Sequence, residues 1–410
     1  MNALPLSGIR IIETASNVAG PLASRLLADR GAEVIKIEHP LYGDMGRDAI
    51  RILADKLTGG RNTASNVNYS SEFNNCNKRG ITLDLSQEGG REVLRKLLET
   101  ADVFVSNFRD YELEKYGLTW ESLFKLNPRL VHANVTGYGR FGPDRNLPGY
   151  DFCAFWTRTG IMRIFLKPDE EPFTTPIAMG DRLTAVALAF GITTALLIRE
   201  KTGEGQEVDA SLMQTGIFAN AQDVNATLVT GEDRQNVDRR DLANALLNSY
   251  ETADGRWLRT AINQPDKYWA RLCKAIGRED LINDPKFNGF HQRIDNHVEL
   301  FNILEASFKS RTLEEWKPRL DEAKIPWAPI STLPEVINDP QARANDMFVG
   351  YDHPTYGKIE IVANPVRLSK APAETRIPAP EFNQHTEEVL LEYGYDWDDI
   401  SRLKETHVIS

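Results

Sequence analysis

Short apolar runs alternate with helical leucine patterns along the first third of the chain. Ile11 and Ile12 belong to a run with the length of a buried strand, and Leu22 and Leu26 then recur at helical spacing. The same alternation continues to about residue 136, which predicts a parallel sheet with helices on its faces. The expected strands lie at residues 8–14, 32–40, 81–85, 102–108 and 130–136, and the expected helices at residues 20–31, 88–101 and 118–128.

The pattern changes in the second half of the chain. Residues 224–241 are polar and charged, which indicates a linker or an exposed crossing. A hairpin with Asp254 and Gly255 at its turn follows, and it precedes a mainly helical second domain. The expected helices of that domain cover residues 267–277, 297–310 and 312–323, and the tail is expected to hold a strand at 358–363 and a helix at 385–394.

One long apolar segment begins beside a carboxylate. Asp181 and Arg182 stand directly before a stretch from Leu183 to Ile198 that carries no charge. Aspartate is a favoured N-cap, so the local pattern predicts a buried helix that Asp181 caps. The sixteen uncharged positions fall short of a membrane span.

Composition narrows the classes of partner. The 410 residues carry a formal net charge of −11, which argues against nucleic acid and anionic membrane surfaces as partners. The N-terminus has no secretory pattern, so we expect a cytoplasmic protein. Cys76, Cys153 and Cys273 lie far apart, which suits reduced thiols and predicts no metal site.

Short motifs carry little chemistry by themselves. The glycines of residues 137–142 match the dinucleotide pattern G-x-G-x-x-G, but Pro143 and Pro148 follow where that motif needs a helix. Lys78 and Arg79 stand beside three asparagines, which fits either a solvated turn or a phosphate site. The aromatic residues of segment 150–160 fit core packing or a substrate pocket.

Longer segments, taken together, resemble one family. They are LSGIRIIETASNVAGPLASRLLADRGAEVIKIEHPLYGDMGR, NCNKRGITLDL, ADVFVSNF, LTWESLFKLNPRLVHANVTGYGRFGP, LPGYD, MGD, REKTGEGQEVDASLMQTG and HTEEVLLEYG. In sequence and order they are similar to the family III CoA-transferases, the formyl-CoA and carnitine type (CaiB/BaiF). The resemblance implies an α/β fold with a Rossmann-like large domain, an inserted small α+β domain and an interlocked, ring-like homodimer. Residues 1–223 and 331–410 would form the large domain and residues 224–330 the small one; a heteromer with a related subunit stays open.

The resemblance also assigns site residues. Asp181 matches the catalytic aspartate, which would carry the acyl group as a mixed anhydride and then as an aspartyl-CoA thioester. Tyr150, Asp151 and Arg182 are candidates on the substrate side. The implied CoA contacts are Asn17, Val18, Ala19, His39, Lys78, Arg79, Asn107, Phe108 and Lys115, of which His39 and Lys115 stand where relatives have arginine. CoA enters as a substrate, and neither a tightly bound cofactor nor a metal is expected.

The implied reaction moves CoA from an acyl-CoA donor, such as succinyl-CoA, to a free carboxylic acid. Residues 244–249 replace the glycine run of the formyl-CoA transferases, which argues against oxalate and formate. The aromatic residues near Asp151 and the segment LLNSY favour a bulky or aryl-substituted acid. The alternative is an α-methylacyl-CoA racemase of the same fold. Racemases have a histidine where this chain has Tyr150, a poor base at neutral pH. A catalytically silent subunit, which would only complete a heteromeric transferase, is disfavoured because Asp181 is present.

Overall fold

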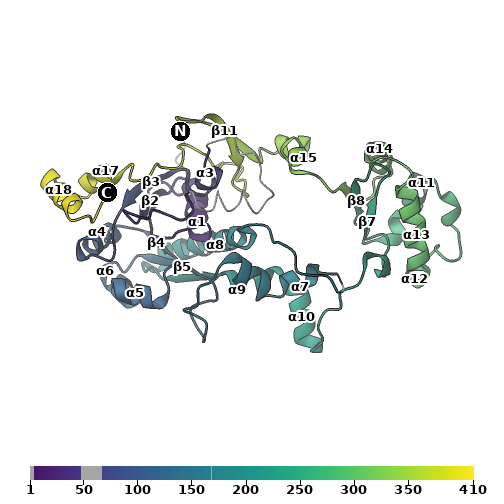
Figure 1. The fold of residues 1–410 in the computed structure, drawn as a ribbon, viewed down its shortest axis with the longest axis horizontal. Coiled ribbons are helices and arrows are strands. Elements are labelled where there is room, and N and C mark those ends of the chain that lie inside the picture. Colours follow the sequence, from purple (N-terminus) through teal and green to yellow (C-terminus); the bar gives the residue numbers. More distant parts are fainter. Residues whose placement is uncertain (1–3, 48–66, 168) are drawn as a thin grey trace. The chain divides into compact units, whose positions relative to one another are not determined.

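The computed structural model describes residues 4–47, 67–167 and 169–410 (Figure 1). The chain divides into two compact units. The large unit comprises Met1–Ile164, Phe173–Glu232 and Gln341–Ser410, and the small unit comprises Phe165–Pro172 and Asp233–Pro340. The predicted boundaries at 223/224 and 330/331 therefore stand nine or ten residues before these divisions.

A parallel sheet forms the centre of the large unit. Within the described residues it has six strands in the order β3-β2-β1-β4-β5-β6, and every pairing between neighbours is parallel. The order reverses between β1 and β4, the position at which doubly wound sheets open a crevice. The strands are β1 (Arg10–Glu13), β2 (Glu33–Glu38), β3 (Lys78–Thr82), β4 (Val103–Ser106), β5 (Val131–Thr136) and β6 (Glu207–Ser211).

Alternating side chains of the strands build two separate cores. Ile11 points to the face covered by α1 (Ala19–Ala28) and α8 (Met179–Thr202), and its neighbour Ile12 points to the opposite face. On that second face α4 (Glu88–Leu98) and α6 (Trp120–Leu126) cover the sheet. The period of two in β1 thus gives one sheet with helices on both sides.

The C-terminal part of the chain covers the edge of the sheet. Strand β3 has a free side, and the backbone N–H of His385 donates to Gly80 O at 2.9 Å while Thr82 N donates to Thr386 Oγ1 at 3.0 Å. These contacts place α17 (Thr386–Glu392) beside β3, with α18 (Trp397–Glu405) packed on it (Figure 1). An edge strand that would otherwise expose its hydrogen-bonding groups is covered. The predicted strand at 358–363 instead pairs in a separate hairpin of β10 (Phe348–His353) and β11 (Gly357–Val362).

The small unit follows its sequence pattern closely. Strands β7 (Ser249–Glu251) and β8 (Trp257–Thr260) form the predicted antiparallel hairpin, and Gly255 at its turn has a φ of +72°. Strand β9 (Trp327–Pro329) adds to β8. Tyr250 and Trp316 are fully buried among the helices of this unit. Those helices are α11 (Pro265–Ala275), α12 (Phe290–Asp295), α13 (His297–Phe308) and α14 (Leu313–Ala323).

Three predictions about local structure were wrong. The first part of the predicted linker, residues 224–230, belongs to helix α10 (Ala221–Thr230), which was missed because none of its residues is buried and no apolar stripe marks it. Strand β3 begins at Lys78, inside the segment interpreted as a turn. Asp181 does not cap α8, because the helix begins two residues earlier and Ala178 occupies the N-cap position.

Helix α8 is the one helix among the described residues that is long and apolar enough to cross a membrane. A core helix of a globular unit meets the same criteria. Ala185, Leu188 and Ile192 are buried against α1 and the sheet, which gives α8 one face in the core of the large unit. Its opposite face exposes Phe190 and Leu197.

Candidate active site

The crevice at the reversal point of the sheet holds most of the predicted site residues. Its lining comes from the turn after β1, the turn after β4 and the first turn of α8, and it has a volume of about 320 Å³. These segments meet because parallel strands end at the same edge of a sheet. The predicted residues that it brings together are Asn17, Val18, Ala19, Asn107, Phe108, Tyr150 and Asp181.

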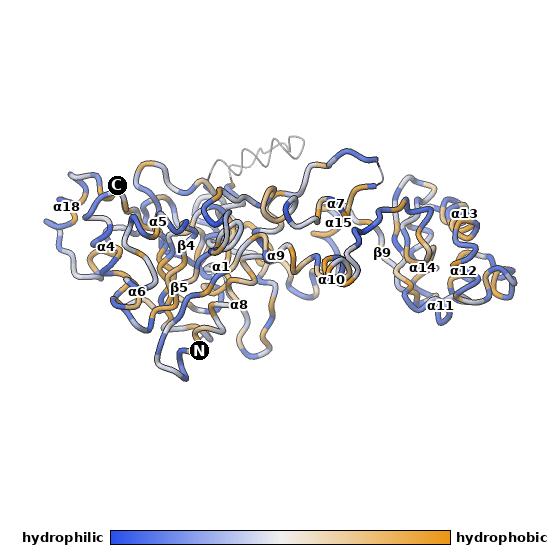
Figure 2. The backbone as a smooth tube through the Cα atoms, turned by 90° about the horizontal axis from the view of Figure 1, so that it is seen from below, coloured by the Kyte–Doolittle hydropathy of each residue, from blue (hydrophilic) through white to orange (hydrophobic). Residues whose placement is uncertain are grey.

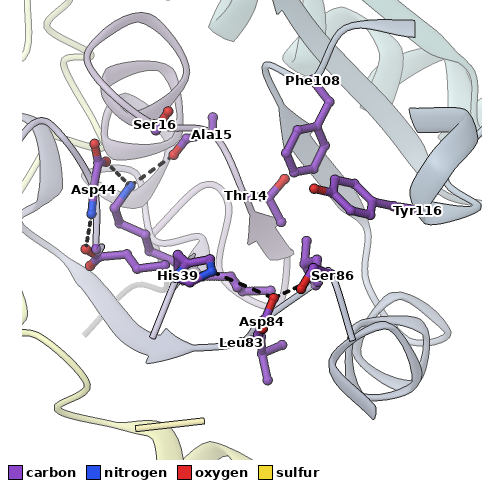
Figure 3. A pocket seen from close by; sticks show the side chains of 15 residues that line it. Thr14, Ala15, Ser16, His39, Asp44, Leu83, Asp84, Ser86, Phe108 and Tyr116 are labelled. Carbon is purple, nitrogen blue, oxygen red and sulfur yellow. Dashed lines mark hydrogen bonds and ion pairs between the residues drawn. The ribbon is translucent and has the colours of Figure 1, made fainter. Parts of the chain in front are cut away.

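A second hollow continues from the crevice along the ends of β1, β2 and β3 (Figure 3). It has a volume of about 280 Å³ and shares Thr14, Ser16 and Phe108 with the crevice. His39 lines this hollow, with its Nε2 3.7 Å from the carboxylate of Asp84. The two hollows therefore adjoin one another within the large unit.

A buried network of charges underlies the turn after β1. The carboxylate of Glu13 contacts Lys36 Nζ at 3.0 Å and Lys78 Nζ at 2.8 Å. Lys36 Nζ also contacts Asp44 Oδ2 at 2.7 Å, and Figure 3 shows Asp44 in this place. Burial alone would raise the pKa of Glu13, but the two ammonium groups outweigh it and hold that pKa below its usual value. Burial lowers the pKa of Lys78 to about 8, which the charge of Glu13 opposes. The four side chains are paired with one another inside the unit.

This network fixes the shape of the first turn. Asp44 Oδ1 accepts hydrogen bonds from Asn17 N at 2.9 Å and from Gly46 N at 2.7 Å. Asn17 has a φ of +69°, a left-handed conformation that asparagine tolerates better than most residues. The ion pair of Lys36 and Asp44 thus holds Asn17 at the mouth of the crevice.

Asn107 ties the turns after β1 and β4 together. Its Oδ1 accepts from Ser16 N at 3.3 Å and its Nδ2 donates to Ser16 O at 3.2 Å. Asn134 donates to Phe108 O at 3.1 Å and accepts from Ser106 Oγ at 2.7 Å, so β5 supports the same turn. Hydrogen bonds of side-chain amides thus connect the two walls of the crevice.

Asp181 stands at the third position of α8 and lines the crevice. Burial raises the pKa of its carboxyl group to about 7, the charge of Asp151 adds to the rise, and Arg182 opposes it. A carboxylate with such a pKa is more basic than an ordinary aspartate, which strengthens it as a nucleophile or base at neutral pH.

Two predicted CoA contacts lie away from both hollows. The side chain of Lys78 is fully buried, and its Nζ also donates to Pro21 O at 2.7 Å and Asn75 Oδ1 at 2.9 Å. Arg79 instead pairs with acidic side chains that include Glu392, at 2.7 Å. Their spacing suggested a phosphate site, but alternation along β3 sends the two side chains to opposite faces of the sheet, Lys78 toward α1 and Arg79 toward α17.

The remaining predicted residues surround the site at different depths. Lys115 is exposed on α5 (Asp110–Tyr116), with its ammonium 5.3 Å from the ring of Tyr116, which lines the second hollow. Asp151 is 3% exposed and lies behind Asp181. Arg182 Nη1 donates to Ile177 O at 2.7 Å and to Ala178 O at 3.0 Å.

Sequence reasoning missed several charged residues of the crevice. Arg109, Glu112 and Arg145 all line it. Arg145 belongs to the glycine- and proline-rich loop after β5, and loops at the carboxyl ends of parallel strands are where such folds place functional residues. Arg109 Nε lies 3.2 Å from Glu112, so that pair contributes little net charge to the crevice.

Comparison with known proteins identifies the family. The model of CoA-transferase family III matches residues 6–386. The chain belongs to CoA-transferase family III.

Relatives in this family share the whole length of the chain. It is 33% identical to (R)-2-hydroxy-4-methylpentanoate CoA-transferase of Clostridioides difficile over 98% of this chain and 99% of the relative. It is 32% identical to cinnamoyl-CoA:phenyllactate CoA-transferase of Clostridium sporogenes, over 98% and 97%. The crystal structure of a CaiB/BaiF family protein from Brucella suis superposes with a TM-score of 0.82 at 29% identity, over 96% of this chain and 100% of that one.

Family membership establishes the class of reaction. The protein is a CoA-transferase, whose substrates are CoA thioesters and free carboxylic acids. The expected Rossmann-like fold is confirmed by the parallel sheet and by this structural match. Among the described residues, no group of three or more His, Cys, Asp or Glu side chains is placed to hold a metal ion.

Replacing Lys36 by methionine tests the charge network. Because Glu13 and Asp44 would lose their shared cation while remaining buried, we expect the free energy of unfolding of the large unit to fall by about 3–5 kcal/mol. Urea unfolding followed by circular dichroism measures the loss. The exposed Lys125 offers a matched control, and a Lys36→Met protein as stable as Lys125→Met would contradict the role of the network.

Proposed function

We propose that Asp181 carries the acyl group and then CoA during transfer. Its carboxylate attacks the thioester carbonyl of the donor, and the CoA thiolate leaves to give a mixed anhydride. The thiolate then attacks the aspartyl carbonyl, which releases the donor acid and leaves an aspartyl-CoA thioester. The acceptor carboxylate attacks that thioester and displaces the CoA thiolate, which gives a mixed anhydride of Asp181 and the acceptor. The thiolate then attacks the acceptor carbonyl, so that acceptor-CoA forms and the Asp181 carboxylate is regenerated.

The position of Asp181 is the observation that carries this proposal. It is the carboxylate in the crevice that stands at the N-terminus of a 24-residue helix. The positive end of the helix dipole favours the negative charge that develops on oxygen at each attack. The raised pKa of Asp181 makes its ionised form a stronger nucleophile than an ordinary aspartate.

The two adjoining hollows of the large unit offer a place for the CoA molecule. We assign the thioester to the crevice, beside Asp181, and the adenosine end to the second hollow, beside His39. The ring of His39 stacks on Tyr42 with centroids 4.6 Å apart, which offers a flat surface for a base. Lys115, near the rim of this hollow, supports a contact with a phosphate group.

We propose a bulky organic acid as acceptor. Leu147, Leu212 and Phe108 give the crevice apolar walls, and Tyr150 adds an aromatic ring. The relatives with acceptors named 2-hydroxy-4-methylpentanoate and phenyllactate support the same class. Phe155 and Trp156 do not add to this argument, because they are buried in a core cluster behind the crevice.

A second copy of the chain is the proposed partner. The consecutive helices α8, α9 (Leu212–Ala219) and α10 expose apolar side chains, and Figure 2 shows orange stretches at α9 and α10. The most exposed of them are Phe190, Leu197, Phe218, Leu228 and Val229, at 60–86% exposure. Exposed apolar side chains on three helices that contact one another in series are typical of an interface, and they support the interlocked homodimer that the family resemblance implies.

Replacing Asp181 by asparagine tests the acyl carrier. Because the amide cannot form the anhydride, we expect kcat for CoA transfer to fall by roughly a thousandfold or more. Glu200→Gln, an exposed change on the same helix, serves as the control. Transfer at an unchanged rate by Asp181→Asn would overturn the mechanism.

A panel of acceptor acids tests the substrate class. We expect kcat/KM to be at least about tenfold higher for 2-hydroxy-4-methylpentanoate or phenyllactate than for oxalate or formate. The reason is that an apolar substrate group buried against the apolar walls stabilises the transition state. Succinyl-CoA and an aryl-acyl-CoA serve as donors, and chromatography of the acyl-CoA products gives the rates. Oxalate as the best acceptor would refute the assignment.

The same donors in deuterated water without acceptor test the racemase alternative, which requires exchange of the α-hydrogen.

Light scattering after gel filtration tests the partner. We expect the mass of two chains, and a shift toward one chain in the double variant Phe218→Ser, Leu228→Ser, because buried apolar area would be lost. Trp397→Ser, an exposed aromatic change on α18, is the matched control. A wild-type protein with the mass of one chain would contradict the dimer.

A further inference from the structure

Helix α8 begins at a residue that cannot cap it. Ala178 occupies the N-cap position with a φ of 56° and has no side chain able to accept a hydrogen bond. The first N–H groups of a helix have no partner within the helix and need acceptors from elsewhere. The carboxylate of Asp181 lines the crevice, so the acceptor has to come from another segment.

Asp151 supplies that acceptor from thirty residues away. It precedes the π-helical turn η1 (Phe152–Thr157), and its Oδ1 accepts from the backbone N of Asp181 at 3.1 Å. Its approach requires a glycine in α8. A Cβ added to Gly180 would lie 2.4 Å from Asp151 Oδ1 and 2.2 Å from Phe155 Cγ, closer than any side chain tolerates.

The same geometry places two carboxylates together. Asp151 is 3% exposed, so its charge acts on Asp181 with little screening by water. Arg182 is the nearest opposing charge, and its Nη1 is already bonded to Ile177 O and Ala178 O. The other charged or titratable groups that line the crevice are Arg109, Glu112, Arg145 and Tyr150.

Neither arginine of the crevice is free to neutralise the pair of carboxylates. Arg109 pairs with Glu112, and Arg145 lies 3.5 Å from Asp110. The electrostatic state of Asp181 is therefore set mainly by burial, by Asp151 and by Arg182. The charge of Asp151 disfavours the ionised form of Asp181. Burial also raises the pKa of Asp151, which hydrogen bonds from the backbone N–H groups of Asp181 and Gly180 and the charge of Arg182 oppose.

We propose that Asp151 is a positioning residue for Asp181: it caps α8 at the Asp181 backbone and, by its charge, keeps the Asp181 carboxylate basic, without touching substrate. This inference rests on the proposed role of Asp181 as acyl carrier. It replaces the expectation that Asp151 lies on the substrate side, since Asp151 does not line the crevice.

The substitution Asp151→Asn separates the two contributions. The asparagine oxygen still accepts from Asp181 N, but the negative charge is lost. Without that repulsion the pKa of Asp181 falls from about 7, and the carboxylate stays ionised to lower pH. The acid limb of the kcat/KM profile then moves to lower pH, and the plateau drops because a less basic carboxylate is a weaker nucleophile.

The experiment compares pH profiles of kcat/KM for the wild type, Asp151→Asn and Asp151→Ala, with a thermal melt of each. For Asp151→Asn we expect an acid limb lower by about one pH unit with a nearly unchanged melting temperature. For Asp151→Ala we expect the same shift and a lower melting temperature, because the cap is lost as well. If the asparagine variant does not fold, Asp151→Ser supplies the pH profile of kcat/KM, because its hydroxyl oxygen is also an uncharged hydrogen-bond acceptor.

Three outcomes overturn the inference. An acid limb that stays in place or moves to higher pH shows that the Asp151 charge does not act on Asp181. A rise in KM for the acceptor acid alone, at every pH, shows that Asp151 binds substrate. Equal melting temperatures for Asp151→Asn and Asp151→Ala show that it is not a cap. If Asp181→Asn is inactive while the Asp151 profiles do not shift, this inference fails and the acyl-carrier role stands.

Discussion

The paired charges beneath the first strand are the interaction on which the site depends. Glu13, at the end of β1, accepts hydrogen bonds from Lys36 of β2 and Lys78 of β3, so side chains from three neighbouring strands meet in one buried cluster. Lys36 extends the cluster to Asp44, which holds the left-handed turn at Asn17. Removing one member would leave a buried charge without its partner, which costs far more than an exposed ion pair contributes. The cluster therefore couples the core of the large unit to the wall of the crevice.

A different arrangement of charge governs the opposite wall. There the carboxylate of Asp151 accepts from the backbone N–H of Asp181 at the start of α8, its charge acts on the Asp181 carboxylate, and the charge of Arg182 opposes it. Around Glu13, charges of opposite sign are matched and lower the pKa of the acid, whereas around Asp181 charges of like sign raise it. The first arrangement stabilises structure, and the second prepares a group to react at neutral pH. The sheet brings both to one crevice because its strand order reverses between β1 and β4.

Periodicity predicted the main elements of both units, but it failed where polar contacts decide the structure. The strands from β1 to β5 and the helices of the small unit have apolar patterns that only one face can bury. Strand β6 and helix α10 lack such a pattern and were missed. Asp181 and Asp151 were both named, but Asp151 was expected on the substrate side, because its contact with α8 joins positions thirty residues apart in sequence and no local pattern marks it. Lys78 was misplaced for a related reason, since a buried cation beside Glu13 and a phosphate ligand look alike until the strand is placed in the sheet.

The central claim, that an aspartate carries the group transferred, is tested most directly by following oxygen. A single turnover is run with an acceptor acid whose carboxylate is labelled with heavy oxygen, and the peptide containing Asp181 is then weighed by mass spectrometry. If the acceptor forms an anhydride with Asp181 and the thiolate attacks the acceptor carbonyl, one labelled oxygen stays on the aspartate, and the peptide gains its mass. If CoA product forms while this peptide keeps its ordinary mass, the acyl group never passes through Asp181 and the account is wrong.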